Sequence, residues 1–136
     1  MIAVDHAGLE VLDIETCLEL LTSVPIGRVA FVDAGDVAIF PVNHAREGRT
    51  IVFRTAGGSK LDAALRIARV TFEADRYDET TRTAWSVLLV GRADVVMEPD
   101  ELARLEALDL EPWAPTERPH WVRIRPDEIS GRRITR

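Results

Sequence analysis

Runs of apolar residues rich in β-branched and aromatic side chains occupy most of the chain after residue 26. Such runs, bounded by turn residues, are typical of β-strands. Six of them predict strands at residues 27–33, 37–43, 50–55, 69–75, 83–96 and 120–126. The turn at 34–36 and the Glu47-Gly48 pair predict hairpins. The first three strands are therefore expected to follow one another as an antiparallel meander.

Three other stretches repeat their apolar residues at helical spacing. The first follows Asp13, a good N-cap, and ends before Pro25. The second follows Ser59, and the third covers residues 99–108. Six strands with few helices favour a closed or nearly closed antiparallel barrel, because an open sheet of this size leaves unpaired edges.

Length and composition restrict the function. The 136 residues are 46% hydrophobic, which predicts a single domain spanning residues 1–136. A net charge of −6 disfavours nucleic acid and anionic membranes as partners. The single cysteine, Cys17, excludes an internal disulfide, and no apolar run is long enough to span a bilayer. We expect a soluble cytoplasmic protein whose arginines at positions 132, 133 and 136 form a solvated tail.

The stretch "FRTAGGSKLDAAL", residues 53–65, joins the third strand to the second helix. A glycine-rich loop before a helix N-terminus exposes backbone N–H groups that attract anions. Arg54 and Lys60 add positive charge there, and Thr55 and Ser59 add hydroxyl groups. Two interpretations follow from the local chemistry: a phosphate site, or an ordinary strand-to-helix turn with a Ser59 cap.

The order of these segments carries a family resemblance. Together "GRVAFVD", "VAIFPVNH", "TIVFRTAGGSKLDAAL", "RVTFEAD" and "AWSVLLVGRADVV" resemble the pyridoxamine 5'-phosphate oxidase-like split barrels, especially their small actinobacterial branch. The resemblance covers roughly residues 9–134. It implies a mainly β fold, a six-stranded antiparallel Greek-key split barrel. It also implies homodimers that hold flavin mononucleotide (FMN) in clefts between the subunits.

The same resemblance implies seven cofactor-binding residues, four at the flavin phosphate and three beside the ring: Arg54, Thr55, Ser59, Lys60, Asn43, Trp85 and Ser86. Alternatives stay open for two of them. Asn43 is also suited to bonding its own turn, and Trp85 to being an ordinary barrel side chain. The family pattern is not matched everywhere, because His44 replaces a commonly aromatic residue and Lys60 stands where the oxidase proper has an Arg-Lys pair.

Four further residues are candidates for the cofactor site, and each has two interpretations. Arg28 is either a cofactor cation or an ion-paired surface residue. His44 is either a residue that exchanges protons in catalysis or a surface or hydrogen-bonded residue. His120, at the start of the last strand, either closes the cofactor pocket from the partner subunit or is an ordinary surface or hydrogen-bonded residue. Trp113 either covers the cofactor or anchors its own Pro-rich loop. The histidines show no metal-ligand spacing, so no metal site is predicted, and no catalytic residue is identified.

The resemblance implies a flavin-dependent oxidoreductase with FMN as cofactor and a small molecule as substrate. In such enzymes the cofactor carries the chemistry, so no catalytic triad is needed in the chain. A deazaflavin-dependent reductase, a flavin or haem carrier without turnover, and a bare dimeric barrel are the alternatives. Fold alone does not decide among them.

Overall fold

The computed structural model describes residues 2–56, 69–110 and 119–135. Its elements are, in chain order, β1 (Glu10–Leu12), α1 (Ile14–Thr22), β2 (Ile26–Asp33), β3 (Asp36–Glu47), β4 (Thr50–Ala56), β5 (Arg69–Asp78), β6 (Thr83–Val95), α3 (Pro99–Glu106) and β7 (Pro119–Ile134). All six predicted strands are present, as are the first and third predicted helices. The helix predicted after Ser59 lies outside the described residues.

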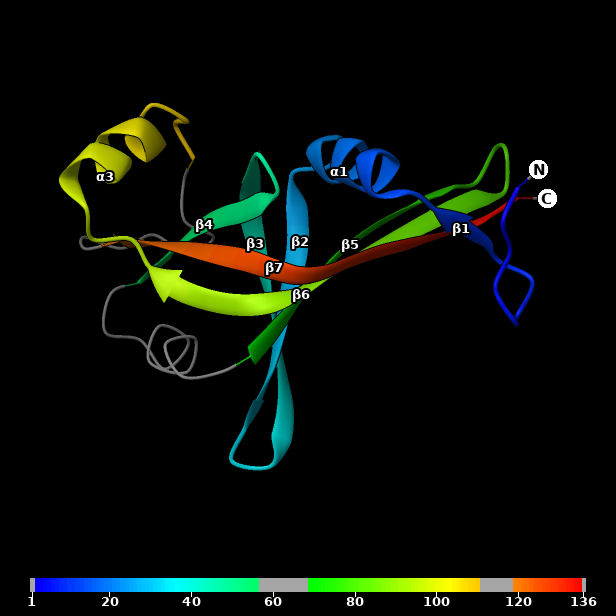
Figure 1. Cartoon of the computed structure of the whole chain (residues 1–136), viewed down its shortest axis with the longest axis horizontal. Coiled ribbons are helices and arrows are strands. Elements are labelled where there is room, and N and C mark those ends of the chain that lie inside the picture. Colours follow the sequence, from blue (N-terminus) through cyan, green and yellow to red (C-terminus); the bar gives the residue numbers. More distant parts are fainter. Residues whose placement is uncertain (1, 57–68, 111–118, 136) are drawn as a thin grey trace.

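Six of the strands form a closed antiparallel barrel (Figure 1). Neighbouring strands follow the order β2–β3–β4–β7–β6–β5, and β5 pairs in turn with β2. The meander of β2, β3 and β4 is as predicted, and β5 returns to lie beside β2, which is the Greek-key order. The prediction of a mainly β, Greek-key split barrel is confirmed.

Strands β6 and β7 form the longest ladder of the barrel and extend beyond it. One edge of β7 pairs with β4 through residues 119–124 and with β1 through residues 131–133, whereas β6 pairs along the other edge. The ladder is irregular at Gly91, where an added Cβ would overlap the carbonyl oxygen of Arg125. The close approach of these two strands therefore requires glycine.

The main core lies inside the barrel and under α1. Buried side chains from alternate strand positions fill it, among them Val29, Phe53, Phe72, Leu89 and Ile124. Helix α1 contributes Cys17, Leu18 and Leu21 to the same cluster. The helix begins as predicted at Asp13, whose carboxylate accepts the Thr16 N–H at 2.8 Å.

A second, smaller core lies outside the barrel, where α3 packs on β4 and β7. Its buried members, which we call the α3 cluster, are Val52, Val96, Leu105 and Trp121. Ion pairs join the helix to the strands: Arg104 to Glu47 at 2.8 Å, and Glu101 to Arg123 at 3.2 Å. As a result, α3 covers the outer face of the sheet close to the end of β4.

The prediction of a solvated arginine tail is wrong for two of its three residues. Strand β7 continues to Ile134, so Arg132 and Arg133 belong to the sheet. Arg132 pairs with Asp5 at 2.8 Å, and Arg133 pairs with Glu10 at 3.5 Å. The extension arises because β1 and β6 both offer edges to this part of β7, which the local sequence does not reveal.

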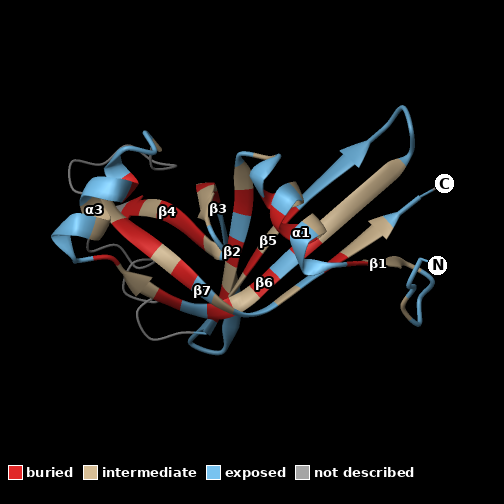
Figure 2. Cartoon of the chain, turned by 45° about the horizontal axis from the view of Figure 1, so that its top comes forward, coloured by how far each residue is buried: buried red, intermediate tan, exposed pale blue. Residues whose placement is uncertain are grey.

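Exposure varies along the strands (Figure 2). Buried positions gather in the barrel, whereas the tip of the β2–β3 hairpin and the connection between β5 and β6 are exposed. None of the described helices has the length and apolar character needed to cross a membrane.

Candidate functional site

The structure describes five of the seven predicted cofactor-binding residues: Asn43, Arg54, Thr55, Trp85 and Ser86. Ser59 and Lys60 lie outside the described residues, and so do the glycine pair before them and Trp113. The anion-site interpretation of this junction therefore stays a prediction. Its nearest described part is the end of β4, which carries Arg54.

Arg54 is held by three groups on the outer face of the sheet. Its guanidinium lies over the Trp121 ring, 5.0 Å from the centroid. Its Nη1 donates to the carbonyl oxygen of Leu110 at 3.2 Å, and its Nη2 lies 3.7 Å from Oε1 of Glu106. The side chain is only 16% exposed, and its Nε is buried without a hydrogen-bond partner among the described residues. A cation is thus held in place on the outer face of the sheet.

Asn43 shares this outer face, because neighbouring residues of a strand point to opposite sides. Val42 and His44 are buried on the inner side, which directs Asn43 outward. The β3–β4 ladder ends with His44 opposite Phe53, so the next step places Asn43 across from Arg54. The structure therefore brings Asn43 and Arg54 to the same region.

Thr55 points the other way. It is buried, on the face that Phe53 presents to the barrel core. The sequence groups Thr55 with Arg54 because its hydroxyl and the family resemblance suit a phosphate site, but strand geometry places the two side chains on opposite sides of the sheet. Thr55 makes contacts of its own within the molecule.

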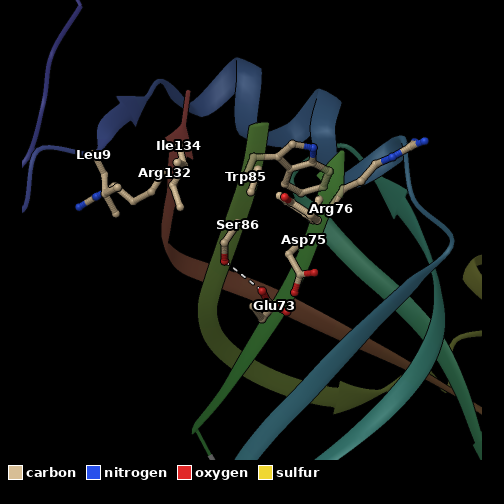
Figure 3. Close-up of a pocket in the computed structure, with 10 residues that line it drawn as sticks. Leu9, Glu73, Asp75, Arg76, Trp85, Ser86, Arg132 and Ile134 are labelled. Atoms are coloured by element: carbon tan, nitrogen blue, oxygen red, sulfur yellow. Dashed lines mark hydrogen bonds between the residues drawn. The ribbon is translucent and has the colours of Figure 1, made fainter. Parts of the chain in front are cut away.

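Trp85 and Ser86 lie on β6, in the part of the sheet that extends beyond the barrel. Both line a cavity of about 300 Å³ together with Glu73, Asp75 and other residues of β5 and β7. Ser86 donates a hydrogen bond to Glu73 at 3.0 Å (Figure 3). Trp85 also packs against the main core, in keeping with its interpretation as a barrel side chain.

The cavity wall carries a pair of neighbouring carboxyl groups. Nη1 of Arg28 donates to Glu73 at 2.8 Å and to Asp75 at 3.0 Å. Burial, followed by the adjacent Asp75 carboxyl, raises the pKa of Glu73 above its ordinary value, while Ser86 and Arg28 oppose this rise. Arg28 is therefore ion-paired, which agrees with the second of its two interpretations.

The described site residues fall into two groups that lie far apart: Arg54 with Asn43, and Trp85 with Ser86. Arg54 faces Trp121 near the start of β7, whereas Ser86 faces Arg132 near its end. Trp121 and Arg132 are eleven positions apart, which corresponds to roughly 35 Å along the strand. An FMN molecule is much shorter than this. One FMN bound at Arg54 therefore does not reach Trp85 or Ser86 of the same chain.

The two candidate histidines differ in their settings. His44 is buried, its Nε2 donates to the Leu21 carbonyl at 2.8 Å, and its ring contacts Phe72 edge-on. Burial lowers its pKa, so the neutral form is favoured. This supports the structural interpretation of His44. His120 is half-buried beside Thr55 in the β4–β7 ladder.

The fold and the site residues can now be compared with known proteins. The chain matches the family model described as pyridoxamine 5'-phosphate oxidase over residues 13–133. It belongs to the pyridoxamine 5'-phosphate oxidase-like family. The matched region runs from the N-cap of α1 almost to the end of β7. The resemblance seen in the sequence is confirmed.

Several known proteins are similar to this chain over most of their length. The uncharacterized protein Rv0080 of Mycobacterium tuberculosis is 38% identical over 90% of this chain and 84% of its own. The structure of the FAD binding protein from Mycobacterium smegmatis is 39% identical, covers 91% of this chain and 98% of that chain, and has a TM-score of 0.81. A structure from Corynebacterium glutamicum is 38% identical, covers 94% and 99%, and has a TM-score of 0.83.

The sequence alone does not point to Glu106 and Trp121, two residues whose side chains lie against the Arg54 guanidinium. Nothing local marks them, because Trp121 reads as a strand residue and Glu106 as the end of a polar helix. They meet Arg54 only because β7 pairs with β4 and α3 packs over both strands. Family membership likewise gives the fold, while the contacts of Arg54 come from this chain's own structure.

Proposed function

We propose that this protein binds a flavin through its phosphate tail and uses it to oxidise or reduce a small molecule. The observation that carries the proposal is the 39% identity, over 98% of that chain, to a protein named as FAD binding. The family resemblance favours FMN as the flavin, and the name of this similar protein makes FAD a second candidate. Both carry the phosphate group that the site requires.

The described residues fit such a tail. Arg54 is a mostly buried cation held against the Trp121 ring, and Arg is well suited to binding phosphate oxygens. Asn43 lies on the same face and offers an amide to the cofactor. Ser59 and Lys60 are proposed to complete the phosphate site. When bound, the flavin supplies the hydride or electron transfer, and the chain binds and orients it.

We further propose that the active unit is a homodimer. The roughly 35 Å along β7 between the two groups of predicted residues leaves the site of one chain incomplete. A second copy is able to supply Trp85 and Ser86 to the cofactor held at Arg54 of the first. Exposed apolar side chains on β2 and β3, such as Val37 and Ile39, provide a surface for this association.

Binding of riboflavin, FMN and FAD to the purified protein tests the proposal. Arg54→Gln is expected to weaken FMN binding about 10- to 100-fold, because a hydrogen bond between charged groups is lost. Riboflavin has no phosphate, so its affinity is expected to change less than twofold. Fluorescence quenching and absorbance titrations measure both affinities.

The matched control is Arg46→Gln, since Arg46 bonds Thr22 and Gly48 away from this site. Unchanged FMN affinity in Arg54→Gln would remove Arg54 from the phosphate site. A protein that takes up none of the three flavins would refute the proposed function. Uptake of a deazaflavin alone would favour the deazaflavin-dependent reductase instead.

A further inference from the structure

The carboxylate of Glu106 shares the Arg54 site. Its Oε1 accepts the Trp121 indole N–H at 2.8 Å and lies 3.7 Å from Nη2 of Arg54. The Glu106 side chain is 55% exposed, against 16% for Arg54. An anion that approaches this guanidinium from solvent therefore meets a negative charge beside it.

The consequence depends on the charge of the anion. A terminal phosphate monoester such as that of FMN carries a charge of about −1.5 to −2 near pH 7. The pyrophosphate of FAD carries a similar total charge, but this charge is divided between two phosphates: the phosphate at Arg54 carries a single negative charge, and the other phosphate lies one bridging oxygen farther away. Because repulsion falls with distance, a fixed carboxylate penalises a terminal phosphate, whose whole charge is adjacent, more than a diester phosphate.

We propose that Glu106 is a specificity-determining residue that weakens binding of terminal phosphates at Arg54 and so favours a dinucleotide flavin over FMN. This rests on the proposed function, since it takes Arg54 as the phosphate ligand. Glu106, the last residue of helix α3, would thus distinguish FMN from FAD. The cation itself is positioned from outside this helix, because Trp121 of β7 supports the Arg54 guanidinium and the carbonyl of Leu110, after α3, accepts from it.

The Glu106→Gln substitution removes the negative charge of this side chain and keeps its size and its hydrogen-bond acceptor. The glutamine carbonyl still accepts the Trp121 N–H, while the negative charge is gone. FMN affinity is expected to rise about three- to tenfold, which is the effect of removing one nearby, partly screened charge. FAD affinity should rise by a smaller factor, and riboflavin affinity should stay within twofold. The FMN gain should also shrink at high salt.

The control is Glu101→Gln, the same change on the same helix at a carboxylate that pairs with Arg123 rather than Arg54. It is expected to leave the ratio of FMN to riboflavin affinity unchanged. A merely structural role of Glu106 would shift all three flavins together, which would overturn the inference. If Glu106→Gln raised the affinities for FMN and FAD by equal factors, Glu106 would not distinguish the two flavins and the inference would be overturned.

Arg54→Gln distinguishes failure of this inference from failure of the proposed function. If Arg54→Gln weakens FMN binding but Glu106→Gln does not strengthen it, the inference is wrong and the proposed function stands. If Arg54→Gln leaves FMN binding unchanged, Arg54 is not the phosphate ligand and the inference is refuted, while flavin binding by the protein stands. Absence of binding by any flavin refutes both.

Discussion

His44 shows how a single residue gains its role from burial. Sequence analysis leaves two interpretations, since histidine readily exchanges protons near neutral pH. In the structure its side chain is buried under α1, with Nε2 bonded to the Leu21 carbonyl. Its Nδ1 is buried and has no partner among the described residues. Protonation would place an unpaired N–H and a charge in the core, so the folded state requires the neutral ring.

This gives a pH prediction. Because burial lowers the pKa of His44 in the folded state, the unfolded state binds the proton more readily. The free energy of unfolding should therefore fall as the pH drops below about 6.5, by at most about 1.4 kcal/mol per pH unit. Urea denaturation between pH 7.5 and 5 measures it. In His44→Gln this component should vanish, whereas the exposed His6→Gln should keep it; equal pH slopes in all three proteins would contradict the assignment.

At the level of elements, the contact between α1 and β7 explains why the sequence pattern misses the second half of β7. The predicted last strand ends at residue 126, whereas β7 continues to Ile134. The inward position 131 carries glycine rather than an apolar side chain, because Cys17 of α1 fills that space. The alternation that predicts strands is therefore lost where a helix packs directly on the backbone.

Gly131→Ala tests this contact. The new Cβ would lie 2.7 Å from Sγ of Cys17 and 3.2 Å from Cδ1 of Leu12. Overpacking of this kind is expected to lower the free energy of unfolding by about 1–3 kcal/mol. Removing the sulfur with Cys17→Ala should relieve the clash, so the double variant should lose less stability than the sum of the single variants. Additive losses in chemical denaturation would contradict the proposed contact.

For the whole molecule, the exposed apolar surface bears on assembly. Val32 and Val37 are paired across the β2–β3 hairpin, with Ile39 on the same face, and all three are exposed. This hairpin projects from the barrel (Figure 1). Together with the long separation of the two groups of site residues, the surface supports the proposed homodimer.

Ile39→Asp is expected to dissociate the dimer, because it places a charge on the proposed interface. Sedimentation velocity at micromolar concentration should show a dimer for the unaltered protein and a monomer for the variant. The variant should also bind FMN more weakly, since Trp85 and Ser86 of the second copy are lost. Met97→Asp is the control, an exposed apolar residue that lies between β6 and α3. A monomeric unaltered protein would refute the dimer.

By itself, the sequence determined the strands of the barrel, the cap of α1, the third helix and the family, because these follow from local periodicity and the order of segments. Tertiary structure decided which distant residues meet. Pairing of β4 with β7 brings Trp121 and Glu106 to Arg54, and strand alternation turns Thr55 away from it. Periodicity predicts the face of an element but not its partner, so the charge beside the candidate phosphate site became visible only in the folded chain.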